Sequence, residues 1–197
     1  GNEVDGDAMI YILGKRMKAR GTLNDNTVVT TIMSNSGFVN SLAEIGIKCE
    51  QTKVGDRFVY ECMQANDYAI GGEQSGHIIM KKYATTGDGI LTAIMIAEEI
   101  CDSKSTLAQL AEPIKFYPQY LKNLRVKDKA AVFADANVMA AKDEVEKLIN
   151  GKGRALLRQS GTEPVVRVMI ESETQEQCVE YAEMIAKAIT EGGHCVE

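Results

Sequence analysis

Proline placement limits how this chain can fold more than any other feature. Two of the three prolines among its 197 residues, Pro113 and Pro118, fall in the short segment Glu-Pro-Ile-Lys-Phe-Tyr-Pro. Proline fixes its own backbone angle and keeps the preceding residue out of the helical region, so this segment should be extended. We therefore predict two domains, residues 1–112 and 120–197, joined by a linker at residues 113–119.

The region before the linker alternates between strand and helix patterns. Residues 27–33 are rich in β-branched side chains, which favour a strand. A helical pattern opens at Ser36, and Asp88 is placed to cap another. The expected strands are residues 8–13, 27–33, 48–52 and 68–70, and the expected helices begin at Ser36 and span 57–66 and 89–101. This alternation predicts an α/β layered domain.

The region after the linker has a different pattern. Strand-like stretches cover residues 121–126, 154–158 and 165–171, and helical periodicity covers residues 136–149 and 174–189. Strands separated by two helices predict a small α+β domain.

Charge and composition exclude several classes of function. A net charge of −6 argues against nucleic acid as the main partner, because that usually needs a broad basic surface. No apolar run is long enough to cross a membrane, and no secretory signal opens the chain. The five cysteines are odd in number and form no CxxC pair, so we expect reduced thiols in a cytoplasmic protein.

The segment Arg-Gln-Ser-Gly-Thr-Glu-Pro, residues 158–164, carries the chemistry of a phosphate site. Arg158 and Arg167 offer planar forks of donors that match phosphate oxygens. Ser160 and Thr162 add hydroxyl donors, and Gly161 lets backbone N–H groups approach an anion. The alternative is an ordinary polar turn with arginines on a solvated face.

A second cluster, Gly-Gly-Glu-Gln-Ser-Gly-His at residues 71–77, is rich in glycine. Glu73 can accept hydrogen bonds from two neighbouring hydroxyls, which suits a sugar, and Ser75 can both donate and accept. His77 could carry protons near neutral pH. A glycine-rich turn with an exposed Glu and a packed His explains the same residues equally well.

Three smaller motifs complete the set. Arg57, in Val-Gly-Asp-Arg, could contact an anion or sugar, although the local chemistry slightly favours a salt-linked turn capped by Asp56. Thr-Thr-Gly-Asp-Gly at residues 85–89 most simply builds a turn and a helix cap at Asp88. Asp5 and Asp7 have no third acid nearby, so we expect them to be structural rather than a metal site.

Taken together and in order, these motifs resemble the α-D-phosphohexomutase superfamily. The segment at residues 71–77 is similar to its sugar-binding loop, and residues 158–164 with Arg167 are similar to its phosphate-binding loop. With glutamine at position 74, the loop resembles that of the bacterial members that act on glucosamine phosphates. Members that act on mannose and glucose phosphates tend to carry methionine at this position.

The resemblance implies the third and fourth domains of a four-domain, Mg²⁺-dependent isomerase, the fourth built on an antiparallel sheet with two helices. A phosphoserine of the whole enzyme would exchange its phosphoryl group with glucosamine 6-phosphate or glucosamine 1-phosphate through a bisphosphate. Glu73 and Ser75 would hold sugar hydroxyls, with Arg57 and His77 lining the cleft and His77 as a possible assistant in proton transfer. The phosphate that is not transferred would be bound by Arg158, Ser160, Gly161, Thr162 and Arg167.

Two motifs of the superfamily are missing from this chain. Neither the serine motif Thr-Ala-Ser-His-Asn-Pro nor the metal loop Asp-Gly-Asp-x-Asp-Arg occurs. We therefore expect an excised part of a longer protein that binds no metal, has no catalytic residue of its own and is inactive without its N-terminal domains. The alternatives are an enzyme of another sugar phosphate and a phosphosugar-binding module without catalysis.

Overall fold

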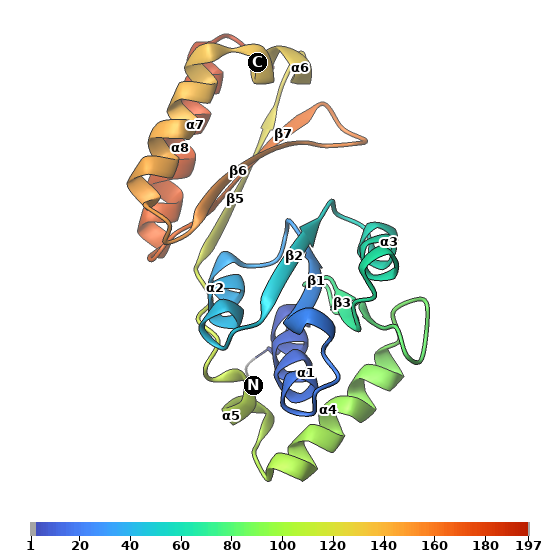
Figure 1. Cartoon of the computed structure of the whole chain (residues 1–197). Helices are drawn as coiled ribbons and strands as arrows, with labels where there is room; N and C mark the ends of the chain where they lie inside the picture. The colour runs from blue at the N-terminus through green and yellow to red at the C-terminus, as the bar shows by residue number, and fades with distance from the viewer. Residues whose placement is uncertain (1–2, 197) are drawn as a thin grey trace. The chain divides into compact units, whose positions relative to one another are not determined.

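The chain folds into two compact units, residues 1–116 and 117–197, each with its own hydrophobic core. The computed structural model describes residues 3–196 (Figure 1). The units meet in sequence between Phe116 and Tyr117, within the segment that its prolines predict to be extended. The predicted fold class is confirmed in both units.

The first unit is built on a four-stranded sheet with strand order β2-β1-β3-β4. The strands β1 (Thr27–Thr31), β2 (Lys48–Thr52) and β3 (Ile70–Gly72) are parallel, and β4 (Ile78–Met80) is antiparallel to β3. In this arrangement the carboxyl ends of β1, β2 and β3 open toward one edge, which is where α/β sheets place ligands.

Helices cover both faces of this sheet. The helix α3 (Asp56–Asn66) packs on one face, where Val29, Val59 and Met63 form a small core. The larger core contains Val28 together with α1 (Gly6–Ala19) and α2 (Ser36–Glu44). The remaining elements of this unit are the 3-10 helix η1 (Asn24–Asn26), α4 (Gly89–Ser103) and α5 (Leu107–Ala111).

The second unit is an antiparallel sheet with strand order β5-β7-β6. Its strands are β5 (Gln119–Arg125), β6 (Arg154–Gln159) and β7 (Val165–Glu171). The helices α7 (Ala136–Ile149) and α8 (Gln175–Glu191) share its core, and α6 (Lys129–Ala134) follows β5.

The predicted strand at residues 8–13 is wrong, because these residues lie inside α1. Asp5 caps the helix by accepting a hydrogen bond from the Ala8 N–H at 3.0 Å. The helix packs against the sheet and against α4, so four consecutive side chains are at most 3% exposed: Ile10, Tyr11, Ile12 and Leu13. A helix buried on all sides has no polar stripe, and a short apolar run then looks like a strand.

Other boundaries differ in smaller ways. The strand predicted at residues 68–70 is β3, which instead contains Gly71 and Gly72. A side chain at Gly71 would lie 2.8 Å from the Met63 sulfur and from the Val29 carbonyl oxygen, so glycine is required for close packing inside the strand. The elements β4, α5 and α6 were not expected from the sequence.

Candidate functional site

The candidate sugar-binding residues lie in the loop that joins β3 to β4, residues 73–77. The Glu73 N–H donates to the His77 carbonyl at 3.1 Å, and the Gly76 N–H donates to the Glu73 carbonyl at 2.9 Å. A side chain at Gly72 would approach the His77 carbonyl oxygen to 2.5 Å, so the hairpin can close this tightly only with glycine there. The loop therefore projects from the carboxyl end of β3 in one defined shape.

The start of α1 packs directly against this loop. The Gly6 N–H donates to the Gln74 carbonyl at 2.9 Å, and the Gln74 side-chain amide donates to Asp5 Oδ2 at 3.2 Å. A Cβ atom on Gly6 would lie 2.1 Å from the Glu73 carbonyl oxygen. The Asp-Gly-Asp motif is therefore structural, as the sequence predicts: it caps a helix and brings that helix against the loop.

The Glu73 carboxylate is positioned by a neighbouring backbone group. Its Oε1 atom accepts a hydrogen bond from the Gly55 N–H at 3.1 Å. Gly55 precedes α3 at a φ of 130°, a conformation that glycine adopts freely. A carboxylate has about four acceptor positions, so the fixed Glu73 keeps capacity for hydroxyl donors. Ser75, two residues on, is exposed.

His77 lies between two other segments of the first unit. Its Nε2 atom accepts a hydrogen bond from the Gly87 N–H at 3.2 Å and also lies 3.2 Å from Asp56 Oδ2. Gly87 is tight against the imidazole, because a Cβ there would approach the ring to 2.6 Å. Asp88, the next residue, caps α4 through the Leu91 N–H at 2.9 Å, which confirms the predicted cap. The motifs at residues 54–57 and 85–89 thus both contact the loop of residues 73–77.

Arg57 lies beside this cluster but its side chain is engaged elsewhere. The guanidinium bonds to Glu61 one turn along α3 at 2.7 Å, and the side chain is 81% exposed. The Glu61 carboxylate raises the pKa of Arg57 above its ordinary value. The role predicted for Arg57 in sugar binding is untested and stays a prediction.

The candidate phosphate-binding residues form the hairpin between β6 and β7. The loop of residues 160–164 is closed by the Ser160 N–H, which donates to the Val165 carbonyl at 2.9 Å. The hydroxyl of Ser160 is buried and accepts the Glu163 N–H at 3.3 Å, whereas Gly161 and Thr162 are exposed. Ser160 therefore shapes the loop, and the exposed Gly161 and Thr162 present their polar groups to solvent.

A lysine that the sequence did not single out holds this loop. Lys129, the first residue of α6, donates from Nζ to the Ser160 carbonyl at 2.7 Å and to the Glu163 carbonyl at 3.2 Å. Lys129 and Ser160 are 31 positions apart in the sequence, so no local motif contains this contact.

The two arginines of the phosphate loop lie directly opposite each other. Arg158 of β6 pairs in register with Arg167 of β7, so their side chains share one face of the sheet. The nearest carboxylate contact of Arg167 is a loose one, 3.9 Å to Glu163 on an exposed side chain. Like charges directly opposite on a sheet destabilise it. The pair is therefore suited to an anion that bridges both guanidiniums.

The structure offers no candidate metal centre in the part of the chain that it describes. Between residues 3 and 196, no group of three or more His, Cys, Asp or Glu side chains is placed to hold a metal ion. Asp5 caps α1, and Asp7 is buried and accepts the Asn35 N–H at 2.8 Å. These acids do not fit a Mg²⁺ site, so no chemical step in this chain is assigned to the ion.

Two further expectations concern the whole chain. All five cysteines are free, in agreement with the prediction of reduced thiols. Within the described residues, no helix is long and apolar enough to cross a membrane.

Comparison with protein families decides the classification. The model described as phosphoglucomutase/phosphomannomutase, alpha/beta/alpha domain III, matches residues 5–117. The model of the C-terminal domain of the same family matches residues 121–188. The chain belongs to this family. The resemblance to the α-D-phosphohexomutase superfamily, inferred from the motifs, is thereby confirmed.

Among curated relatives, the chain is similar to bacterial phosphoglucosamine mutases. It is 50% identical over 196 residues to that of Lachnospira eligens, covering 100% of this chain and 44% of the relative. It is also 50% identical over 189 residues to that of Bacillus subtilis, covering 96% of this chain and 42% of the relative. The chain therefore spans less than half the length of these proteins.

Solved structures of this superfamily have the same fold. N-acetylphosphoglucosamine mutase of Aspergillus fumigatus, in complex with GlcNAc-6P and magnesium, matches with a TM-score of 0.78 at 17% identity, covering 98% of this chain and 45% of that one. A phosphoglucomutase/phosphomannomutase family protein of Burkholderia thailandensis matches with a TM-score of 0.76 at 19% identity, covering 98% and 43%. At these identities the likeness concerns the fold alone.

Proposed function

We propose that this chain is the substrate-binding part of a phosphoglucosamine mutase, an isomerase that interconverts glucosamine 6-phosphate and glucosamine 1-phosphate. The observation that carries the proposal is the in-register pair of Arg158 and Arg167, which has the chemistry of a phosphate site. The relatives at 50% identity support the choice of an amino-sugar phosphate.

The two loops divide recognition of the substrate in this proposal. Glu73 accepts hydrogen bonds from sugar hydroxyls with the capacity left by its bond to Gly55, and the exposed Ser75 adds a hydroxyl. Arg158 and Arg167, with Gly161 and Thr162, bind the phosphate that is not transferred. Binding a remote phosphate supplies energy for orienting the sugar, which must be presented in two orientations through a bisphosphate intermediate.

The chemical step belongs to the rest of the whole protein. We propose that a phosphoserine outside this chain gives and receives the phosphoryl group, and that Mg²⁺, which is present in the Aspergillus fumigatus complex, is bound there as well. His77 is exposed enough to reach a substrate, at 39% of its side chain, and in this proposal it assists proton transfer.

Calorimetric titration of the chain tests the proposal. We expect glucosamine 6-phosphate to bind more tightly than glucose 6-phosphate, and inorganic phosphate to bind most weakly. Arg158→Ala should weaken all three by about 10- to 100-fold, because a charged hydrogen bond contributes roughly 1.5–3 kcal/mol. Lys147→Ala, which removes an exposed cation of α7, is the control for loss of charge alone and should change little.

A second variant separates the two loops. Glu73→Gln should weaken binding of both sugar phosphates while inorganic phosphate binds as before. Equal losses for all ligands would contradict the division of labour. Stronger binding of glucose 6-phosphate than of the amino sugar would favour a phosphomannomutase/phosphoglucomutase instead.

A further inference from the structure

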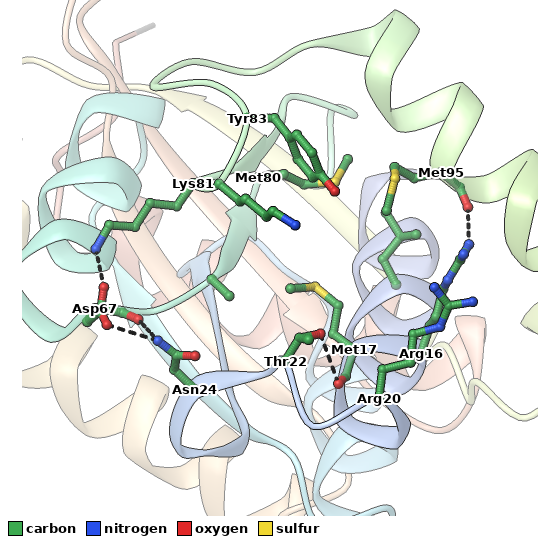
Figure 2. A pocket seen from close by; sticks show the side chains of 13 residues that line it. Arg16, Met17, Arg20, Thr22, Asn24, Asp67, Met80, Lys81, Tyr83 and Met95 are labelled. Carbon is green, nitrogen blue, oxygen red and sulfur yellow. Dashed lines mark hydrogen bonds and ion pairs between the residues drawn. The ribbon is translucent and has the colours of Figure 1, made fainter.

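The first unit contains a cavity of about 590 Å³ (Figure 2). It lies at the end of β3 and β4 opposite to the loop of residues 73–77. Ala69, just before β3, and Met80, at the end of β4, both line it. The loop joins the other ends of these same two strands. The cavity is therefore separate from the candidate sugar site, and its volume is typical of pockets that enclose small organic molecules.

Much of the cavity wall is apolar and adaptable. Met17 of α1, Met80 of β4 and Met95 of α4 all line it, together with Leu13. In Figure 2, Met80 and Tyr83 lie at the top of the cavity, Met95 lies at the right and Met17 lies below. Unbranched, polarisable thioethers fit irregular ligands and make favourable contacts with aromatic rings.

The polar part of the wall is dominated by cations. Four basic side chains line the cavity, Arg16, Arg20, Lys81 and Lys82, against one carboxylate, that of Asp67. Carboxylates of α4, which are not part of this lining, lie close to two of the four cations.

Carboxylates compensate three of these cations. Arg16 contacts Glu98 at 2.9 Å, Glu99 at 3.4 Å and Asp102 at 3.0 Å. Arg20 shares Asp102 at 2.6 Å.

Lys81 pairs with Asp67 at 2.7 Å, and Asn24 donates to the same carboxylate group at 3.0 Å. Figure 2 shows these three residues together on one side of the cavity.

Lys82 is different. No ion pair joins it to any carboxylate among residues 3–196, and its Nζ lies 5.3 Å from the centre of the Tyr83 ring. Lys82 lines the cavity and is exposed to solvent, so its ammonium is available to an anionic group attached to an apolar body.

We propose that this cavity binds a small organic anion, with the acidic group of the ligand at Lys82 and its apolar body against Met17, Met80 and Met95. The inference does not depend on the proposed function, because the cavity shares no residue with either candidate loop. It predicts a ligand site in addition to the phosphosugar site.

A matched pair of fluorescent probes tests the proposal. 8-Anilino-1-naphthalenesulfonate has an apolar body and one anionic group, and N-phenyl-1-naphthylamine has the same body without the charge. We expect both to bind the native chain, with the anionic probe binding about tenfold more tightly. Equal affinities of the two probes would overturn the role assigned to Lys82.

Three variants locate the binding. Lys82→Met should weaken the anionic probe about tenfold and leave the neutral probe unchanged. Lys15→Met, which removes an exposed lysine of α1 outside the cavity, is the control and should change neither. Ala69→Leu fills the cavity and should abolish both, with circular dichroism confirming that the variant is folded.

Competition completes the test. A saturating concentration of glucosamine 6-phosphate should leave the fluorescence of the anionic probe unchanged. Displacement by the sugar phosphate, or undiminished binding to folded Ala69→Leu, would overturn the proposal.

Discussion

The loops at residues 73–77 and 160–164 are both tips of β-hairpins, but they are held in opposite ways. The first is tied to three other segments by hydrogen bonds from the N–H groups of Gly6, Gly55 and Gly87. The second faces solvent over most of its length, and its two flanking strands carry guanidiniums placed opposite each other.

The difference shows two routes to a binding loop. Backbone donors fix the loop of residues 73–77 before any ligand arrives, so its ordering cost is met during folding. On the strands that flank the loop of residues 160–164, Arg158 and Arg167 repel each other. This repulsion lowers the stability of the free chain, and a bound anion would remove it. Hydrogen bonds hold both loops, but only the second is flanked by two like charges.

The largest expected effect tests the steric half of this comparison. Gly6→Ala should lower the free energy of unfolding by about 3 kcal/mol, because its Cβ would lie 2.1 Å from the Glu73 carbonyl oxygen. Gly161→Ala is the matched variant in the other loop, where a Cβ meets nothing within 4 Å, and should change stability by less than about 0.5 kcal/mol. Urea unfolding of the two variants gives the comparison, and similar losses would show that the loops are equally packed.

Alkaline pH should affect the first unit through Cys49. Burial raises the pKa of this thiol from 9.0 to about 11, so the folded chain keeps a proton that the unfolded chain releases above pH 9. The stabilisation is fully present below pH 9 and is lost as pH rises toward 11, by about 2 kcal/mol. In Cys49→Ala this part of the pH dependence should be missing, as measured by urea unfolding from pH 8 to 11.

The exposed Cys101 supplies the control for that experiment. Cys101→Ala should show the same loss of stability with pH as the unmodified chain. If Cys49→Ala also follows the unmodified chain, Cys49 is not the group responsible.

A variant of Lys129 tests whether the loop of residues 160–164 is stabilised by anything besides strands β6 and β7. Lys129→Met removes the bonds to the Ser160 and Glu163 carbonyls and should weaken inorganic phosphate binding about fivefold, at a cost of about 1 kcal/mol in stability. Lys127→Met is the matched control, because Lys127 donates to the Gly193 carbonyl instead. Equal effects of the two variants would indicate a general effect of charge rather than support of the loop.

The smallest expected effect has the opposite sign. Arg158→Gln should raise the stability of the phosphate-free chain by about 0.2–1 kcal/mol, because it removes the like-charge pair with Arg167. The same variant should bind phosphate more weakly. Thermal unfolding with and without 10 mM phosphate measures both, and a loss of stability without phosphate would show that the arginines do not repel each other.

The sequence predicted those helices and strands whose periodicity and end signals both lie within the element or next to it. The helix at residues 136–149 begins after its cap, Asp135, and ends at Asn150 in the left-handed conformation, and a strand forms at residues 165–171 as expected. The run at residues 8–13 misled because its partners lie on every side. These residues form a helix because Asp5 caps it and α4 packs against it. Neither Asp5 nor α4 belongs to the apolar run itself.

The candidate site shows the same division. The side chains of Glu73, His77 and Arg158 were singled out as candidates because their chemistry is visible in the sequence. The supports of these side chains were not, because Gly6 and Gly55 act through backbone N–H groups and Lys129 through carbonyl oxygens 31 and 34 residues away. The opposition of Arg158 and Arg167 was also hidden, because it depends on the register of β6 and β7.

One atom of His77 joins three segments of the first unit. Its Nε2 accepts the Gly87 N–H at 3.2 Å and lies 3.2 Å from Asp56 Oδ2. Gly87 belongs to the segment that leads into α4, and Asp56 is the first residue of α3. A substitution of this one imidazole would therefore loosen the loop of residues 73–77 from the starts of two helices at once.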